Sequence, residues 1–341
     1  MFGGVSPEHE VSLSSAYSVL TNIDKEKYNI TRVGITKDGK WLLFEGDDSH
    51  IKSGEWPLYS NKSAILSPCR DRRLYVIEDG AIVEQKNIDV IFPVMHGSFS
   101  EDGTLQGLFE LSGIPFVGPG CLSSAVSMDK AMTKLILKNY GIPQAKGLLI
   151  SKRELYDSYP QIAKVALLFS YPVFVKPSAG GSSIGASKVN DESELLPALK
   201  AAFEVCDRVL LEEYINGREI EVAVMGNSNP VSSVCGEIKP GSDFYDYDTK
   251  YINDTATLHI PAELSEETSQ KIRLMATKIY NALNCKGLAR VDFFVDGDTV
   301  RFNEINTIPG FTDISMFPKL FIHSGVAYSS LIDRLIDLAL E

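Results

Sequence analysis

Short runs of apolar and β-branched residues alternate along the chain with segments whose apolar residues recur at helical spacing. This alternation is typical of βα units built around largely parallel sheets. Residues 87–96 predict a buried strand that delivers His96 to its carboxyl end, where ligands tend to bind in such folds. Residues 104–111 predict the next helix, and residues 113–120 predict a second short strand that ends the first structural unit.

The remaining elements are predicted in the same way. Helices are expected over residues 123–140, 192–205, 266–284 and 324–340, and strands over 171–176, 208–215, 219–225, 287–295 and 299–305. Asn216-Gly217 predicts a hairpin between the second and third of these strands, and Asp296-Gly297 predicts another between the last two. The polar, tyrosine-rich segment from Pro240 to Leu258 is too long for a simple connection and indicates a functional loop.

Composition narrows the class of protein. The chain of 341 residues exceeds what one hydrophobic core serves, and its 44% apolar and 23% charged residues are ordinary for an α/β enzyme. The net charge of −12 argues against general binding to nucleic acid or anionic lipid. The five cysteines are scattered and form no CxxC pair, which argues against disulfides and a zinc site. No apolar run approaches the length of about 20 residues that a membrane-spanning helix needs. Since the first residues also lack a signal-peptide pattern, we expect a cytoplasmic protein without a membrane span.

Residues 178–185 form a loop rich in glycine and serine, directly after the strand that ends in Lys176. Glycine lets backbone N–H groups approach phosphate closely, and a cation at the strand end can neutralise phosphate oxygens. The loop lacks the P-loop pattern, and Gly118 and Gly120 do not extend into a dinucleotide-binding pattern. A plain connection is the alternative interpretation of this loop.

Residues 210–219 place three carboxylates around a strand and a turn. Because side chains alternate along a strand, Glu212 and Tyr214 share one side while Glu213 takes the other. Glu212 could then accept a hydrogen bond from an adenine amino group or a ribose hydroxyl. A solvated sheet edge explains the same residues equally well.

The strongest local signal is a pair of strands over residues 289–294 and 302–310. Arg290 and Asp292 lie on one face of the first strand, and Glu304 and Asn306 lie on one face of the second. One shared face would hold three oxygen ligands and a guanidinium, which suits Mg²⁺ that keeps waters and binds ATP phosphates. A chance salt bridge between strands is the alternative.

Two further positions are less informative. A lone histidine such as His96, even with Glu101 and Asp102 nearby, is more often a structural residue than a ligand. Glu8 precedes a helix that is predicted to begin near Val11, and a helix-capping role is favoured for it.

Taken in order, these segments resemble the D-alanine–D-alanine ligases of the ATP-grasp superfamily over nearly the whole chain. The matching motifs are Phe2-Gly-Gly-x-Ser-x-Glu-His-Glu-Val-Ser12, His96-Gly-x-x-x-Glu-Asp-Gly-Thr-Leu-Gln-Gly107, Met128-Asp-Lys130, Val175-Lys-Pro-x-x-x-Gly-Ser-Ser-x-Gly185, Glu212-Glu-Tyr-x-x-Gly-Arg-Glu219, Phe244-Tyr-Asp-Tyr-x-x-Lys-Tyr251, Ala289-Arg-Val-Asp292 and Asn303-Glu-Ile-Asn-Thr-x-Pro-Gly-Phe-Thr312. The resemblance implies an α/β fold, α+β in its C-terminal part, with three domains over residues 1–120, 121–210 and 211–341. The first domain would contain a parallel sheet and bind one D-alanine, and ATP would lie between the other two.

The resemblance also implies a role for each matching residue. The ATP-binding positions are Lys130, Lys176, Ser183, Glu212, Glu213, Glu219 and Lys250. The ligands of two Mg²⁺ or Mn²⁺ ions are Asp292, Glu304 and Asn306. The catalytic positions are Glu8, Ser182, Tyr251 and Arg290, and the amino acids would contact His96, Gly310, Ser315, Met316 and Tyr245. Some members of the family have Lys where Glu213 stands, which weakens its assignment to adenine.

In the implied chemistry, the γ-phosphoryl group of ATP passes to the carboxylate of the first D-alanine and gives an acylphosphate, a step that depends on positioning and charge neutralisation. The amine of the second D-alanine then attacks the acyl carbon. Arg290 and N–H groups near Gly310 would stabilise the oxyanion, and Glu8 would hold the ammonium of the first substrate. The dipeptide serves peptidoglycan synthesis, and the family resemblance indicates a homodimer.

Acceptor choice is the open functional point, because related ligases use D-lactate or D-serine in the second position. Enzymes for D-serine tend to carry Phe in place of Tyr245 and Arg in place of Met316. Enzymes for D-lactate tend to lack the Lys250-Tyr251 pair and also carry the Arg. The residues present here favour a small apolar acceptor, and we hypothesise D-alanine.

Two alternatives stay open at this point: another ATP-grasp ligase acting on a different carboxylate, and a non-catalytic ATP-binding module. The first gives no reason to keep Glu8, Ser182 and Tyr251 together, and the second is expected to lose a metal ligand or Arg290. One departure from the family is the short strand before Phe2, so we expect a chain with a longer first strand to be more stable.

Overall fold

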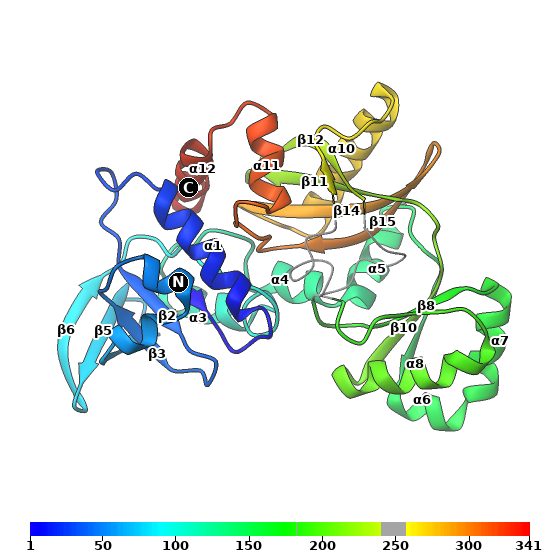
Figure 1. Ribbon diagram of the computed structural model, residues 1–341, viewed down its shortest axis with the longest axis horizontal. Helices are drawn as coiled ribbons and strands as arrows, with labels where there is room; N and C mark the ends of the chain where they lie inside the picture. Colours follow the sequence, from blue (N-terminus) through cyan, green and yellow to red (C-terminus); the bar gives the residue numbers. More distant parts are fainter. Residues whose placement is uncertain (182, 240–256) are drawn as a thin grey trace.

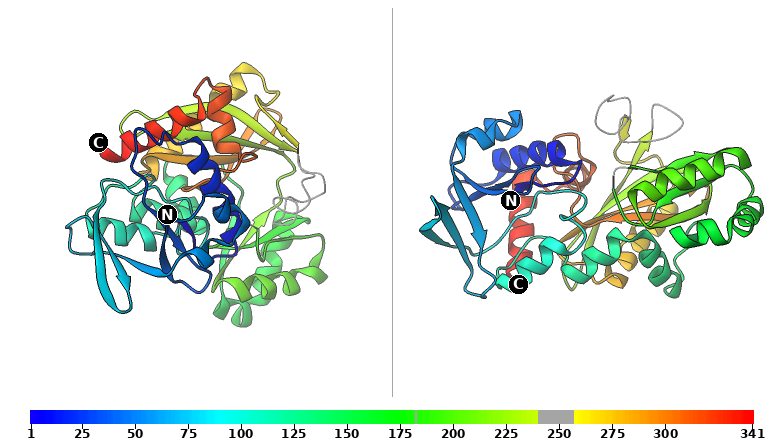
Figure 2. Two further views of the ribbon diagram at one scale, coloured as in Figure 1. Left: turned by 60° about the vertical axis from the view of Figure 1, so that its left-hand side comes forward. Right: turned by 90° about the horizontal axis from the view of Figure 1, so that it is seen from below.

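The computed structural model describes residues 1–181, 183–239 and 257–341, and in this part of the chain the strands form three sheets. A six-stranded sheet comes from the N-terminal part, a four-stranded sheet from the middle and a five-stranded sheet from the C-terminal part. The N-terminal and middle sheets lie at opposite ends of the long axis, with the C-terminal sheet between them (Figures 1 and 2). This arrangement agrees with the three α/β units that the sequence predicts.

The N-terminal sheet is mixed rather than purely parallel. Its strands are β1 (Phe2–Gly3), β2 (Arg32–Ile35), β3 (Trp41–Phe44), β4 (Lys62–Leu66), β5 (Arg73–Glu78) and β6 (Ala81–Asn87). β1 pairs with β2 in parallel, whereas each later strand pairs antiparallel with the strand before it. The turn between β5 and β6 is Asp79-Gly80, both with positive φ, and such a short turn can join only antiparallel strands.

The strand predicted over residues 87–96 is wrong as a regular element. Asn87 is the last residue of β6, and the rest of this segment makes only isolated bridges, from Ile91 to Phe116 and from Val94 to Phe2. Pro93 has no backbone N–H, so a continuous ladder of hydrogen bonds cannot form there. The strand predicted over residues 113–120 is likewise reduced to the bridge at Phe116.

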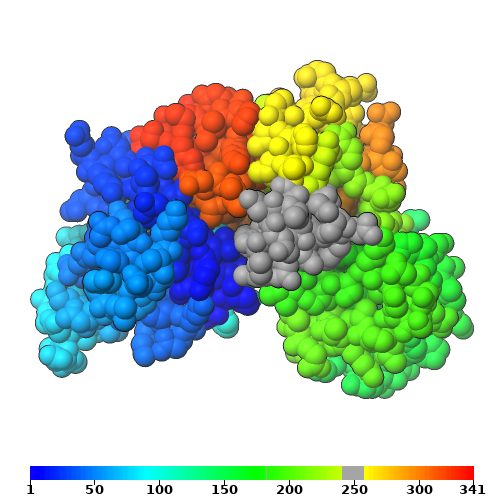
Figure 3. All heavy atoms as spheres, viewed as in Figure 1, coloured from blue at the N-terminus to red at the C-terminus, as the bar shows by residue number. Residues whose placement is uncertain are grey.

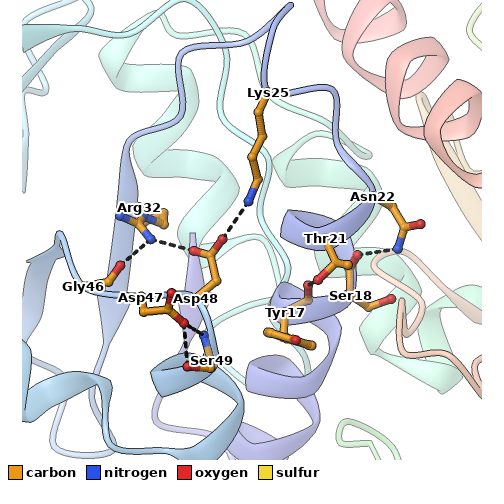
Figure 4. A network of polar contacts seen from close by, with 10 residues as sticks. All are labelled: Tyr17, Ser18, Thr21, Asn22, Lys25, Arg32, Gly46, Asp47, Asp48 and Ser49. Carbon is orange, nitrogen blue, oxygen red and sulfur yellow. Dashed lines mark hydrogen bonds and ion pairs between the residues drawn. The ribbon is translucent and has the colours of Figure 1, made fainter.

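The helical layer of this part contains α1 (His9–Asn22), α2 (Ser49–Ser53), the 3-10 helix η1 (Trp56–Tyr59) and α3 (Thr104–Ser112). The side chain of Asp48 bonds to residues from the neighbouring loop and strand of this part (Figure 4). The Asp48 carboxylate accepts hydrogen bonds from Lys25 at 3.0 Å and from Arg32 at 2.6 Å, and Arg32 also donates to the carbonyl of Gly46 at 2.7 Å. These bonds link the loop after α1 to β2 and to the start of α2.

The helix predicted over residues 123–140 is two helices, α4 (Cys121–Met128) and α5 (Lys130–Asn139). Asp129 breaks it, because its backbone is extended and its carboxylate accepts the N–H groups of Ala131 and Met132 at the start of α5. The hydroxyl of Ser178 donates to the same carboxylate at 2.6 Å. The break therefore places Lys130 in the first turn of α5, beside the loop after Lys176.

The middle sheet has the strand order β7-β10-β8-β9. Its elements are β7 (Gly147–Ser151), α6 (Lys152–Asp157), α7 (Tyr159–Phe169), β8 (Val173–Pro177), β9 (Ser187–Val189), α8 (Glu192–Val205) and β10 (Arg208–Glu213). The hairpin predicted at Asn216-Gly217 is wrong, because β10 pairs with β7 and β8 whereas β11 (Arg218–Met225) joins the C-terminal sheet. Gly217 crosses between the sheets, and a Cβ there would lie 3.1 Å from the carbonyl oxygen of Val295.

The C-terminal sheet has the order β13-β12-β11-β14-β15. Its other elements are β12 (Val231–Lys239), β13 (Thr257–His259), α10 (Glu266–Ala282), β14 (Leu288–Asp296), β15 (Thr299–Asn306), α11 (Met316–His323) and α12 (Tyr328–Leu340). β14 and β15 pair antiparallel, as predicted, but the two-residue turn is Gly297-Asp298, because Asp296 still pairs with Thr299. Most of the predicted functional loop lies outside the described residues, but its flanking strands β12 and β13 pair with each other.

The limits predicted for the three units differ from the packing in two places. Leu137 of α5 shares a hydrophobic core with β14 and α10, so α5 packs on the C-terminal sheet. The middle sheet extends to Glu213, three residues beyond the predicted limit at residue 210. Within the described ranges, no helix combines the length and the apolar character needed to cross a bilayer.

Candidate active site

Two adjoining pockets share Lys130, Gly180, Glu221 and Glu304 in their walls. The first pocket lies between the N-terminal and C-terminal parts, and the second lies between the middle and C-terminal sheets; Figure 3 shows the hollow between the N-terminal and middle parts. The predicted site residues in the first pocket are Glu8, His96, Lys130, Arg290, Glu304, Asn306, Gly310, Ser315 and Met316. Those in the second pocket are Lys130, Lys176, Ser183, Glu212, Glu213, Glu219, Asp292 and Glu304. The predicted residues Ser182, Tyr245, Lys250 and Tyr251 lie outside the described residues.

A buried charge cluster forms one wall of the second pocket. Nζ of Lys176 on β8 lies 2.8 Å from Oε2 of Glu212 on β10, and Lys134 on α5 contacts the other oxygen of Glu212. Burial alone would raise the pKa of Glu212, but the two lysines hold it below its usual value. Burial, with Lys176 adding to it, lowers the pKa of Lys134 against the pull of Glu212. Sequence analysis missed Lys134, because no local pattern distinguishes it from a surface lysine of α5.

The rest of the second pocket suits a nucleotide. Phe174, Ile215 and Phe294 give it apolar walls, and Glu219 lies among them. Glu213 accepts the backbone N–H of Lys146 at 2.9 Å, so its carboxylate is tied to the chain before β7. An apolar slot with carboxylates at its edge can hold a base and bind its amino or hydroxyl groups.

Lys130 stands where the two pockets meet. Its Nζ donates to the carbonyl of Gly180 at 2.7 Å and lies 3.6 Å from Oε2 of Glu304. Lys130 therefore contacts both the loop after Lys176 and the strand β15. Lys130 and Lys176 both line the second pocket, where their ammonium groups can approach one phosphate chain.

The predicted face on β14 and β15 is present. The strand register sets Asp292 opposite Glu304 and Arg290 opposite Asn306. Nδ2 of Asn306 donates to Oδ2 of Asp292 at 3.0 Å, which brings three oxygen-bearing side chains together. No group of three or more His, Cys, Asp or Glu side chains suited to a metal occurs among the described residues. Two carboxylates and an amide nevertheless match the partial oxygen shell of Mg²⁺, which keeps waters and takes further ligands from phosphates.

Arg290 is fixed by two carboxylates. Its Nε and Nη2 each donate to Asp292 at 2.8 Å, and its Nε lies 2.9 Å from Oε2 of Glu221 on the neighbouring strand β11. Burial disfavours the charged guanidinium, but Asp292 and Glu221 outweigh it and hold the pKa of Arg290 above its usual value. The motif analysis missed Glu221, although its alternation with Glu219 along β11 places both on one face.

Glu8 does not cap α1 with its side chain, contrary to the favoured interpretation from sequence. Its carboxylate instead lies beside Gly97 and beside Gly181, which lines the first pocket. A Cβ at Gly97 would lie 2.5 Å from Oε2 of Glu8, and a Cβ at Gly181 would lie 3.1 Å from it. The absence of side chains at these positions therefore makes room for the carboxylate.

The far end of the first pocket is formed by the start of α11. The hydroxyl of Ser315 accepts the N–H of Thr312 at 2.9 Å, and a Cβ at Gly310 would lie 2.6 Å from it. Met316 packs against Gly236 of β12, where a Cβ would meet its sulfur at 2.8 Å. The wall beside Ser315 is therefore apolar and closely packed.

His96 lies in the first pocket, but both of its ring nitrogens contact protein atoms. Nδ1 is 2.9 Å from the carbonyl oxygen of Ile308, and Nε2 is 3.2 Å from Oγ of Ser15. Burial lowers the pKa of His96 although the Glu8 charge opposes it. Glu101 lies in the same pocket, where burial and the charge of Glu8 raise its pKa to about 8.

The second pocket, which suits a nucleotide, lies between two antiparallel sheets. It adjoins the first pocket at Lys130 and at the carboxylates of β14 and β15. This is the arrangement of an ATP-dependent ligase with the ATP-grasp fold. Comparison with known proteins makes the assignment specific. The chain belongs to the D-alanine–D-alanine ligase family, because residues 1–119 match the family described as "D-ala D-ala ligase N-terminus" and residues 136–337 match "D-ala D-ala ligase C-terminus".

Individual relatives agree with this family. The chain is 50% identical to the D-alanine--D-alanine ligase of Acetivibrio thermocellus over 356 residues, which covers 100% of this chain and 95% of the relative. Among solved structures, the VanG D-Ala:D-Ser ligase from Enterococcus faecalis has a TM-score of 0.90 at 38% identity, covering 99% of this chain and 97% of that one. The D-alanine-D-alanine ligase from Coxiella burnetii has a TM-score of 0.85 at 36% identity, covering 99% and 92%. The predicted ATP-grasp fold and ligase class are confirmed.

Proposed function

We propose that the protein joins two D-alanine molecules to give D-alanyl-D-alanine for peptidoglycan precursors, with ATP converted to ADP and phosphate. The observation that carries the proposal is the shared wall of the two pockets. Because Lys130 and Glu304 border both, a terminal phosphate in the second pocket and a carboxylate in the first would meet beside them.

In the first step, the carboxylate of the donor D-alanine attacks the γ-phosphorus of ATP, and ADP leaves. Lys130 and Lys176 would neutralise the phosphate oxygens, and Glu8 would bind the ammonium of the donor in the first pocket. Asp292, Glu304 and Asn306 would hold Mg²⁺ or Mn²⁺, which when bound neutralises phosphate charge. Phosphoryl transfer depends mainly on such positioning and neutralisation.

In the second step, the amine of the acceptor attacks the acyl carbon of the acylphosphate, a C–N bond forms and phosphate leaves. Negative charge develops on the carbonyl oxygen before phosphate departs. Arg290 and Gly310 line the first pocket, and the guanidinium of the one and the backbone N–H of the other would stabilise that charge. Ser315 would bind the carboxylate of the acceptor.

The acceptor is proposed to be D-alanine because Met316 presents an apolar wall beside Ser315. D-Serine is the second candidate, since the solved structure with 38% identity is named a D-Ala:D-Ser ligase. A competition with equal D-alanine and D-serine, read by mass spectrometry of the products, separates the two. D-Alanyl-D-serine as the main product would overturn the assignment.

The activity itself is tested by ADP release from ATP and Mg²⁺ with and without D-alanine. Release that depends on D-alanine supports the ligase, whereas nucleotide binding without turnover would favour a non-catalytic module. Glu304→Gln is expected to abolish phosphoryl transfer while the fold is kept. Glu110→Gln serves as its matched control, because Glu110 accepts the backbone N–H of Cys121 at 2.8 Å away from both pockets. Retained activity in Glu304→Gln would count against its metal role.

We further propose that the enzyme is a cytoplasmic homodimer. The reduced cysteines agree with a cytoplasmic location, since all five are free of disulfides. Light scattering after gel filtration tests the dimer, and a mass equal to a single chain of 37.5 kDa would contradict it.

A further inference from the structure

Residues 308–311 lie in the connection between β15 and α11, and all but Phe311 line the first pocket. Ile308 and Phe311 flank Pro309 and Gly310 and are only 3% and 1% exposed. Both backbone groups of Ile308 and the N–H of Phe311 bond to side chains of the N-terminal part, more than 200 positions earlier in the sequence, while the Phe311 carbonyl accepts from Tyr328 at 2.7 Å. The orientation of this C-terminal segment is therefore fixed from another domain.

One loop of the N-terminal part holds both polar groups of Ile308. Nδ1 of His96 lies 2.9 Å from the Ile308 carbonyl oxygen, and the Ile308 N–H donates to Oε1 of Glu101 at 2.9 Å. Oε2 of Glu101 accepts the N–H of Gly97 at 2.8 Å, which closes the contact back onto the same loop. Rotation of the peptide at Ile308 would break bonds to His96 and Glu101 together.

The other side of the segment is held from α1. The N–H of Phe311 donates to Oγ of Ser15 at 3.2 Å, and that oxygen lies 3.2 Å from Nε2 of His96. The Ile308 carbonyl can only accept, so Nδ1 of His96 carries the proton and Nε2 accepts from the hydroxyl of Ser15. Burial lowers the pKa of His96, which keeps the ring neutral as these bonds require.

One backbone N–H of residues 308–311 takes no part in these bonds. The N–H groups of Ile308 and Phe311 are used, and Pro309 has none, so within residues 308–311 only Gly310 keeps an N–H outside the network. We propose that Ser15, His96 and Glu101 form an interdomain clamp that aims the Gly310 N–H at the carbonyl oxygen of the reacting acylphosphate. The three are positioning residues, and the assignment rests on the proposed ligase function.

The test combines amide hydrogen exchange with kinetics on the full chain. Ser15→Ala and Glu101→Leu are expected to speed exchange in peptides that contain residues 308–311, because each removes the acceptor of a buried N–H. We expect kcat to fall roughly 10- to 100-fold, as small displacements of an oxyanion donor have large effects. The KM for ATP should stay near the wild-type value, since the clamp does not line the second pocket.

Matched controls come from the same part of the protein. Ser112 is as buried as Ser15, but its hydroxyl donates to Phe109 within α3 at 2.7 Å. Ser112→Ala and Glu110→Gln should therefore leave both the exchange of residues 308–311 and kcat unchanged. The two clamp variants act at opposite ends of the segment, so one remains informative if the other fails to fold.

The two measurements distinguish a failure of the proposed clamp from a failure of the proposed ligase activity. Unchanged exchange at residues 308–311, or faster exchange with wild-type kcat, would overturn the clamp. If the wild-type protein shows no ADP release that depends on D-alanine, the ligase proposal fails. The exchange measurement, made without substrates, then still decides whether Ser15 and Glu101 hold the segment.

Discussion

Replacing Glu212 with glutamine is expected to destabilise the protein more than replacing a lysine that binds it. Glu212 lies between two ammonium groups, 2.8 Å from Nζ of Lys176 and in contact with Lys134. The side chains of Glu212, Lys176 and Lys134 are only 5%, 9% and 11% exposed, so water can compensate little of a lost charge. Glutamine keeps the shape of the side chain and removes its charge.

Removing one partner of a buried ion pair costs about 3–5 kcal/mol, because an uncompensated charge stays buried. We expect Glu212→Gln to lower the free energy of unfolding by that amount. Lys134→Met leaves the Lys176–Glu212 pair intact and should cost much less. Adding Lys134→Met to Glu212→Gln should recover about 1–3 kcal/mol, the usual coupling between contacting residues.

The effect also has a defined pH dependence. Lys176 and Lys134 hold the pKa of Glu212 below 4.5 against its burial. The stabilisation is therefore fully present above pH 4.5 and is lost as the pH falls through the lowered pKa of the folded state. The difference in stability between wild type and Glu212→Gln should shrink in acid.

Urea unfolding followed by far-ultraviolet circular dichroism is the suitable assay. Both tryptophans, Trp41 and Trp56, belong to the N-terminal part, so their fluorescence would not report the middle sheet. A loss below about 1 kcal/mol for Glu212→Gln at pH 7 would refute the reasoning, since buried ammonium groups would then need no partner. A double variant no more stable than Glu212→Gln would refute it as well.

Three further outcomes are expected. The pKa of Glu101 is raised from 4.5 to about 8, so between these pH values the folded state keeps a proton that the unfolded state has lost. As the pH rises through this range, the stability of the wild type should therefore fall relative to that of Glu101→Gln, by up to about 1.4 kcal/mol per pH unit. Equal slopes of stability against pH for the two proteins, measured by urea unfolding, would contradict this. Tyr280→Phe removes a 2.8 Å bond to the carbonyl of Gly226 and should cost about 1–2 kcal/mol, so an unchanged urea midpoint would argue against it. Gly34→Ala would set a Cβ 2.5 Å from the ring of Trp56 and should cost about 1–3 kcal/mol by overpacking, measured as a lower melting temperature.

Sequence reasoning succeeded where a local pattern determines the geometry. The β14–β15 pair follows from alternation of side chains and a two-residue turn, and Asp292 indeed faces Glu304 across it. It failed at Asn216-Gly217, where a dipeptide typical of hairpin turns instead joins two different sheets. Glycine is needed at 217 because of the backbone of Val295, a contact that no local window contains.

The candidate site shows the same division. Motifs identify the pocket residues by type, but they do not show which of them are held by other protein groups. His96 is bonded on both ring nitrogens by Ser15 and Ile308, which are 81 and 212 positions away in the sequence. Lys134 and Glu221 complete buried charge clusters and belong to no motif, so only the tertiary structure reveals them.

The three sheets are joined by two different kinds of contact, and this difference affects how easily each pocket can open. Leu13 of α1 and Phe317 of α11 share one hydrophobic core, so the N-terminal and C-terminal parts that enclose the first pocket form one packed body. The middle sheet has its own core within residues 148–211 and meets the rest through polar contacts, such as the 2.7 Å bonds from Lys130 to the carbonyls of Ser178 and Gly180. A seam held by polar contacts opens at lower cost than a shared core, because its groups can bond to water when separated. The second pocket lies at this seam, so we expect nucleotide to enter and leave there without disturbing the proposed clamp on residues 308–311, which lies within the packed body.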